Sequence, residues 1–125
     1  MTRVIAIGDG PVIAEPANDL QLRQLVTAAA SAGDLSITSV QLAGRHRRLQ
    51  TTRSTRVYVV LTGSITMQIG DDEPERVDAG ELLVVPRGVA YELAGTGTYL
   101  VINAPAFVEG DDDYLDYPDR TEPAR

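Results

Sequence analysis

The chain has 125 residues, of which 43% are hydrophobic and 23% are charged, and it contains no cysteine. This size suits one globular domain with its own core, and the lack of cysteine excludes disulfides, thiolate metal sites and a cysteine nucleophile. The net charge of −7 makes nucleic acid an unfavourable partner. No apolar run is long enough to span a membrane, and the first residues lack a signal-peptide core, so we expect a cytoplasmic protein.

All eleven basic residues are arginine, and His46 is the one histidine of the chain. Lysine chemistry is therefore excluded, and so is a metal site built from several histidines. His46 lies in the stretch RHRR, where we expect it at the surface. The nearby arginines are interpreted as a solvated edge, a subunit contact or a basic lip for an acidic ligand: Arg45, Arg47, Arg48 and Arg53.

The first elements expected along the chain are two short β-rich runs within residues 2–15. The pattern then changes, and four apolar residues fall at helical spacing: Leu22, Leu25, Val26 and Ala29. Asn18 or Asp19 can cap the start of such a helix and Gly33 its end. The sequence therefore predicts one amphipathic helix over about residues 19–32.

Between residues 35 and 104 the chain is predicted to alternate short strands with turns. The candidate strands are 35–42, 56–63, 64–70, 80–86, 90–94 and 98–104. Several short strands separated by glycine-containing turns favour an antiparallel sandwich or barrel.

The last residues, 111–125, form an acidic arm interrupted by proline, and they follow a single domain expected over residues 1–110. One interpretation is a solvated arm. The other is that Tyr114, Leu115 and Tyr117 dock on the domain or on a second subunit.

Two spaced motifs lie within residues 44–104. The first comprises Gly44, five residues, Gln50, one residue, Thr52, three residues, Arg56, six residues and Gly63; the second comprises Gly80, five residues, Pro86, one residue, Gly88, two residues and Tyr91. This spacing resembles the two motifs of the cupin superfamily, G-x5-H-x-H-x3-E-x6-G and G-x5-P-x-G-x2-H-x3-N. The resemblance implies a mainly β fold, a double-stranded antiparallel β-barrel, to which the predicted N-terminal helix is added.

Every position that holds a metal ligand in those motifs is substituted here. Gln50 and Thr52 occupy the first two histidine positions, Arg56 the glutamate position and Tyr91 the last histidine position. A guanidinium stays protonated and repels a cation. We therefore expect no metal and no cofactor.

Alternation along a strand places Arg56, Tyr58 and Val60 on one face, and the resemblance implies that this face lines the barrel. We expect three catalytic residues, Arg56, Tyr58 and Tyr91. We expect four substrate-binding residues, Gln50, Thr52, Val60 and Leu93, with the first two facing inward if no bulge intervenes. The alternatives are a satisfied core tyrosine at 91, an ion pair between Arg56 and an acidic neighbour such as Glu92, and ordinary strand roles for Gln50 and Thr52.

The chemistry of these groups favours a metal-independent isomerase, cyclase or lyase that acts on a small carbonyl- or carboxylate-bearing metabolite, in specialised, polyketide-like metabolism. An arginine can bind an anion and a tyrosine can donate to a carbonyl oxygen. The alternatives are a non-catalytic sensor or carrier and a structural barrel filled by side chains. The expected partners are a small molecule and a second copy of the chain, with the N-terminal strands 3–15 as candidates for exchange.

Overall fold

A computed structural model of the chain describes residues 4–115. Its strands are β1 (Ile13–Glu15), β2 (Leu20–Val26), β3 (Ser36–Thr51), β4 (Thr55–Ile69), β5 (Glu75–Asp78), β6 (Leu82–Val85), β7 (Tyr91–Ala104) and β8 (Asp112–Tyr114). Two single-turn 3-10 helices, η1 (Pro16–Asn18) and η2 (Ala29–Ser31), are the only helical turns in this range. The mainly β class expected from the sequence is confirmed.

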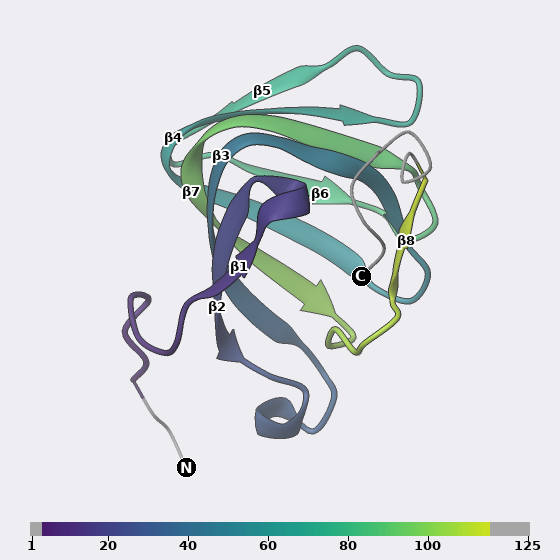
Figure 1. The fold of residues 1–125 in the computed structure, drawn as a ribbon. Coiled ribbons are helices and arrows are strands. Elements are labelled where there is room, and N and C mark those ends of the chain that lie inside the picture. Colours follow the sequence, from purple (N-terminus) through teal and green to yellow (C-terminus); the bar gives the residue numbers. More distant parts are fainter. Residues whose placement is uncertain (1–3, 116–125) are drawn as a thin grey trace.

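All eight strands belong to one antiparallel sheet of order β1-β2-β3-β7-β4-β5, with β6 paired to β4 and β8 paired to β3. The long strands β3, β4 and β7 bend so that the sheet wraps into a barrel-like shape (Figure 1). Within residues 4–115 the sheet does not close on itself, because β1 and β5 end it on opposite sides.

The helix predicted over residues 19–32 is wrong. These residues form β2 and the turn η2, and β2 pairs along its length with β3. Leu20 and Leu22 face the interior at a period of two, while a register shift between Gln24 and Val26 interrupts the alternation. Because of this shift, the apolar residues of the strand fall at intervals similar to those of an amphipathic helix, and this similarity explains the wrong prediction.

The interior of the bent sheet is packed with side chains from β3, β4 and β7. Its fully buried members include Leu42, Leu49, Val60, Ile65, Met67, Tyr91, Leu93 and Tyr99. This core fills one end of the barrel and leaves a cavity toward β1, β2 and β8.

The two ends of the described chain both add strands to the sheet. At one end β1 pairs with β2 of the same chain, and at the other β8 pairs with Leu49–Thr51 of β3. Tyr114 therefore docks on the barrel, whereas Tyr117 and the rest of the acidic arm lie outside the described residues. No helix in residues 4–115 is long and apolar enough to cross a membrane, and the cytoplasmic location stays a prediction.

Candidate functional site

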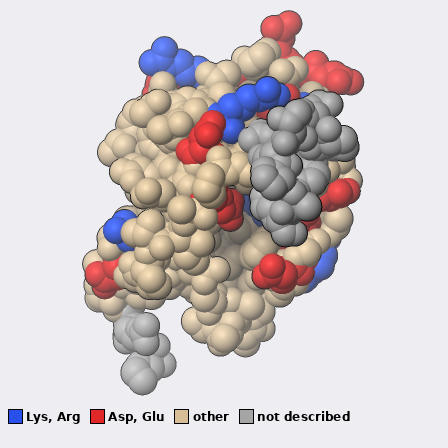
Figure 2. All heavy atoms as spheres, viewed as in Figure 1, with Lys and Arg blue, Asp and Glu red and all other residues tan. Residues whose placement is uncertain are grey.

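A cavity of about 270 Å³ opens inside the barrel, lined by side chains from β1, β2, β3, β4, β7 and β8. Its titratable side chains are Glu15, His46, Arg56, Tyr58, Tyr99, Glu109, Asp112 and Tyr114. Apolar residues such as Leu22, Val40 and Phe107 complete the wall. The face shown in Figure 2 is mostly uncharged, with acidic side chains beside a hollow near its middle. A concave apolar site with a few convergent polar groups is the usual form of a small-molecule site.

Arg56 projects inward from β4 and is almost completely buried. Its Nε donates to Asn103 Oδ1 at 2.6 Å, its Nη1 to the Tyr91 hydroxyl at 2.8 Å and its Nη2 to Asp112 Oδ1 at 2.6 Å. Burial opposes the charge, but the oxygens of Tyr91, Tyr58 and Asp112 outweigh it and raise the pKa of Arg56. Arg56 is therefore a permanent cation that is held by three protein acceptors.

The alternative that Arg56 pairs with an acidic neighbour is confirmed, but the partner is Asp112 and not Glu92. Glu92 points to the other face of β7, where its carboxylate accepts from Arg45 at 3.0 Å and from Arg48 at 3.2 Å. These two arginines thus contribute to a surface ion-pair cluster.

The hydroxyl groups of Tyr58 and Tyr91 are 2.6 Å apart. The Tyr91 oxygen accepts from Arg56, and the Tyr58 oxygen is the one acceptor described for the Tyr91 hydrogen, so we assign Tyr91 as the donor of this bond. Tyr91 is fully buried behind the cavity, whereas Tyr58 lies in its wall. A directed chain from Arg56 through Tyr91 to Tyr58 therefore leaves the Tyr58 hydrogen available to a ligand.

Both tyrosines stay protonated. Burial raises the pKa of Tyr58, and it raises the pKa of Tyr91 well above the ordinary value, against the opposing effect of the Arg56 charge. Tyr58 is thus a hydrogen-bond donor at pH 7, not a base.

His46 is buried in the cavity wall, so the expectation that it lies at the surface is wrong. Its Nδ1 is 2.8 Å from the Arg47 carbonyl oxygen. A carbonyl can only accept, so Nδ1 carries the hydrogen and Nε2 keeps its lone pair. Burial lowers the pKa of His46 to about 4, against the raising effects of the Arg47 carbonyl and Asp112. His46 is therefore a neutral imidazole with an unprotonated Nε2.

Strand β8 and the turn η1 hold the histidine in place. The His46 and Tyr114 rings stack at 6.1 Å between centroids, and the Arg47 guanidinium lies 4.0 Å from the Tyr114 ring centroid. Asn18 joins these elements, because its Oδ1 accepts from Arg47 Nε at 3.0 Å and its Nδ2 donates to Glu15 at 3.2 Å and to the Tyr114 hydroxyl at 3.3 Å.

The structure brings together the three predicted catalytic residues, Arg56, Tyr58 and Tyr91, but it separates the four predicted substrate-binding residues from the cavity. Val60 and Leu93 are core residues, each 1% exposed, and do not line its wall.

The expected inward orientation of Gln50 and Thr52 is wrong. A register shift between His46 and Leu49 moves β3 by one residue relative to β7. The shift buries Leu49 and Thr51 and leaves Thr52 exposed and Gln50 half-buried.

Sequence reasoning missed several polar or aromatic members of the site, among them Glu15, His46, Tyr99, Asn103 and Asp112. Tyr99 and Asn103 share the inward alternation of β7 with Tyr91, so the period of that strand could have identified them. The sequence carries no comparable signal for Asp112, which enters the site only because β8 pairs with β3.

The residues at the metal positions of the cupin motifs do not fit a metal ion. Arg56 is a cation that donates all its described hydrogen bonds, and Gln50 and Thr52 do not line the same cavity. Among the described residues no group of three or more histidine, aspartate and glutamate side chains has the arrangement to hold a metal.

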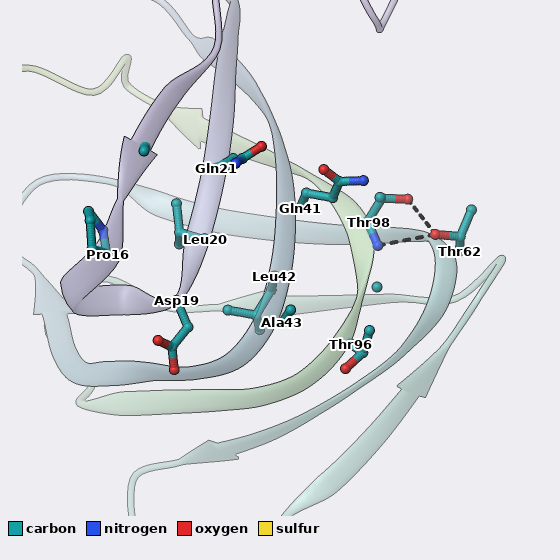
Figure 3. A pocket seen from close by; sticks show the side chains of 12 residues that line it. Pro16, Asp19, Leu20, Gln21, Gln41, Leu42, Ala43, Thr62, Thr96 and Thr98 are labelled. Atoms are coloured by element: carbon teal, nitrogen blue, oxygen red, sulfur yellow. Dashed lines mark hydrogen bonds between the residues drawn. The ribbon is translucent and has the colours of Figure 1, made fainter.

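A larger hollow of about 670 Å³ is lined by side chains from β1, β2, β3, β4 and β7 (Figure 3). Its wall is made of small, neutral groups such as Thr62, Thr96 and Thr98. Its one carboxylate, Asp19, accepts the Arg45 backbone N–H at 2.9 Å. The groups needed for acid–base chemistry therefore lie in the interior cavity.

No protein-family model matches the sequence, and a comparison with curated proteins also finds no match. Solved structures do resemble the fold. Pac13 of Streptomyces, described as a nucleoside dehydratase, is 17% identical with a TM-score of 0.77, and the likeness covers 92% of each chain. KdgF of Halomonas is 15% identical with a TM-score of 0.71 and covers 84% of this chain and 94% of its own.

Oxalate decarboxylase OxdC of Bacillus subtilis is 19% identical with a TM-score of 0.73, and the likeness covers 92% of this chain but 33% of the larger enzyme. At these identities the likeness concerns the fold. The chain has the fold of the cupin superfamily, as the spacing of its two motifs indicated.

Proposed function

We propose that the chain is a metal-independent lyase that removes water from a small β-hydroxy carbonyl metabolite. One observation carries the proposal: a neutral histidine with an unprotonated Nε2 and a tyrosine with an available hydrogen line the same cavity. An elimination of this kind requires a group that takes and returns a proton and a donor that stabilises the oxyanion. Of the isomerase, cyclase and lyase reactions expected from the sequence, this pair favours the lyase.

The reaction begins at the carbon next to the carbonyl. His46 Nε2 takes the proton from this carbon, and the electron pair of the broken C–H bond moves onto the carbonyl oxygen. Tyr58 donates its hydrogen bond to that oxygen, and the enolate is stabilised as it forms. The pKa of His46 is about 4, so this base can act only on a carbon that the carbonyl and Tyr58 together make acidic.

The second step releases water. The enolate electrons form a carbon–carbon double bond toward the β-carbon, the carbonyl re-forms, and the bond to the β-hydroxyl breaks. The protonated His46 returns its proton to the leaving oxygen. The products are an unsaturated carbonyl compound and one water molecule, and His46 and Tyr58 regain their starting states.

Pac13 supplies independent support. Three of its solved structures with uridine are variants, in which one histidine is replaced by glutamine or one of two tyrosines by phenylalanine. Those three residues are 13 and 34 positions apart along that chain. His46, Tyr58 and Tyr91 are 12 and 33 positions apart in this one. The same order and the similar spacing, which differs by one position in each interval, favour a dehydratase and make a nucleoside-like metabolite a suitable first probe.

A panel of β-hydroxy aldehydes, both open-chain and furanose-ring members, tests the proposal. Mass spectrometry of the incubated mixtures is expected to detect loss of water with the wild-type chain. His46→Gln and Tyr58→Phe should each lower the rate by about 100-fold or more. Thr66→Val, on the exposed face of β4, should leave it unchanged. Turnover that survives both site substitutions would refute the assignment.

A non-catalytic binding protein is the second candidate. The low pKa of His46 favours it, because a weakly basic imidazole can serve as a hydrogen-bond acceptor for a ligand hydroxyl. It predicts saturable binding of a ligand that is recovered unchanged after prolonged incubation. The third expectation, a barrel filled by side chains, has less support because the cavity of about 270 Å³ is open.

We also propose that the chain forms a homodimer through the outer face of β6 and of the part of β4 that pairs with it. Thr66 lies outside this patch, where β4 pairs with β5. Leu82 and Val84 are 60% and 50% exposed, and they pair with Val59 and Val57 of β4 on the same apolar face. A sheet face of this kind is stabilised by a partner. Light scattering is expected to give a dimer for the wild type and for Thr66→Glu, and a monomer for Leu82→Glu. Exchange of the N-terminal strands stays a prediction.

A further inference from the structure

The charged side chains of the interior cavity bear on the charge of its ligand. Within residues 4–115 its wall holds three carboxylates, Glu15, Glu109 and Asp112, and one guanidinium, Arg56. His46 is neutral at pH 7, because burial lowers its pKa to about 4. These groups therefore carry a net charge of −2.

The charge of Arg56 is already paired with groups of the protein itself. Its Nη2 is 2.6 Å from Asp112 Oδ1, and its other two nitrogens donate to Asn103 and to Tyr91. A cation already paired with a carboxylate attracts a further anion only weakly. Arg56 is thus a positioning residue for the tyrosine chain and is not an anion receptor, although the sequence alone favoured that role.

Within residues 4–115, no ion pair compensates the other two carboxylates. The Oε1 of Glu15 accepts from the neutral amide of Asn18. Glu109 is exposed at the cavity mouth and Glu15 is half-buried. An anion entering this cavity would approach both carboxylates, and the partial burial of Glu15 strengthens the repulsion from that side chain.

We infer that the cavity selects an uncharged ligand and excludes the phosphorylated and carboxylated forms of the same molecule. The inference rests on the proposed function for the location of the site, and it narrows the substrate class expected from the sequence to the uncharged carbonyl compounds. It also places the reaction before the attachment of a phosphoryl group to the metabolite or after its removal.

The imidazole NMR signals of His46 provide the test, because this is the single histidine of the chain and it lines the cavity. The titrants are uridine, uridine 5′-monophosphate and inorganic phosphate at pH 7 and low salt. Uridine is expected to shift the signals. Uridine 5′-monophosphate should need about tenfold higher concentration or more, and phosphate should have no effect. Glu15→Gln combined with Glu109→Gln should bring the concentration of uridine 5′-monophosphate needed to shift the signals closer to that of uridine.

Asp112→Asn is the decisive variant, because it keeps the shape of the side chain and leaves the Arg56 cation without its carboxylate partner. Phosphate is expected to shift the His46 signals in this variant and to leave them unshifted in Asp78→Asn, an exposed carboxylate paired with Arg76. A shift by phosphate in the wild type, or by uridine 5′-monophosphate at concentrations equal to or below those of uridine, would overturn the inference. No phosphate effect in Asp112→Asn would overturn the role of Asp112.

The two proposals fail separately. If uridine leaves the signals unshifted, the phosphate titrations of the wild type and Asp112→Asn still decide the charge selectivity. If the chain does not catalyse the proposed dehydration, the aldehyde assay shows no loss of water. That result leaves the outcome of these titrations unchanged.

Discussion

Asp112 Oδ1 accepts a hydrogen bond of 2.6 Å from Arg56 Nη2, although the two residues are 56 positions apart in the sequence. Asp112 begins β8, whose pairing with β3 carries the carboxylate over the cavity. The charge of Arg56 is thereby balanced, and Arg56 in turn orients Tyr91. The short C-terminal strand is therefore part of the site and not only a cover for the barrel.

Removal of the Asp112 charge tests this relationship through stability. Asp112→Asn is expected to lower the free energy of unfolding by about 1–3 kcal/mol, because it leaves the buried Arg56 cation without its counter-charge. Urea denaturation followed by circular dichroism measures the change. The matched change Asp78→Asn, at an exposed ion pair, should cost less than about 0.5 kcal/mol. Equal losses of stability in the two variants would show that the Arg56–Asp112 pair contributes no more to stability than an exposed ion pair.

The titration of His46 makes a prediction about pH. The folded-state pKa is lowered to about 4 from an ordinary value of 6.5, so between these values the unfolded chain binds a proton that the folded chain does not. Stability due to His46 should therefore fall as the pH drops from 6.5 to 4, by at most about 3 kcal/mol, and stay constant below that.

The variant His46→Gln isolates this contribution, because glutamine does not titrate. The free energy of unfolding of the wild type minus that of the variant should decrease as the pH drops from 6.5 to 4. An NMR midpoint of His46 near 6.5 in the folded protein, with a pH-independent difference, would contradict the buried neutral imidazole.

A double-mutant cycle tests the hydrogen-bond chain. Tyr91→Phe should destabilise the protein by about 1–3 kcal/mol, because Arg56 Nη1 loses its acceptor in a buried place. Tyr58→Phe and Tyr91→Phe together should show a coupling energy on the order of 1 kcal/mol. The exposed pair Thr62 and Thr98, whose hydroxyls are also 2.6 Å apart, serves as the control with valine substitutions. Additive effects of the two tyrosine changes would argue against a connected chain.

Gly97 allows β7 to approach the backbone of β4 closely. A Cβ at this position of β7 would overlap the Thr62 carbonyl oxygen of β4 and lie 3.3 Å from the Ser64 nitrogen. Gly97→Ala should therefore lower the free energy of unfolding by about 2 kcal/mol or more. Gly8→Ala, where no atom lies within 4 Å of the added carbon, should change it by less than about 0.5 kcal/mol. Similar thermal denaturation midpoints for the two variants would contradict this account.

The fold and part of the site could be predicted because they depend on spacing and period. The motif glycines and Pro86 indicated the strand–turn framework, and strand alternation placed Arg56 and Tyr58 on the same inward face. These features are local, and they survive substitution of every metal-ligand position.

The remaining features depend on register and on long-range pairing. The bulge between His46 and Leu49 inverts the orientation of Gln50 and Thr52 and accompanies the burial of His46, and no residue in RHRR signals it. Asp112 is 56 positions from Arg56, and β8 has only three residues. The predicted helix failed for a related reason, since a bulged strand and a helix share the same apolar spacing over residues 20–26.

The central claim is that His46 Nε2 removes a proton next to a carbonyl group, and deuterium exchange tests it most directly. Aldehydes that match the active members of the panel but lack the β-hydroxyl cannot lose water, so in D2O they report the first step alone. We predict that the wild-type chain and Thr66→Val incorporate deuterium at the carbon next to the aldehyde and that His46→Gln does not. Incorporation by His46→Gln at the wild-type rate would contradict the account.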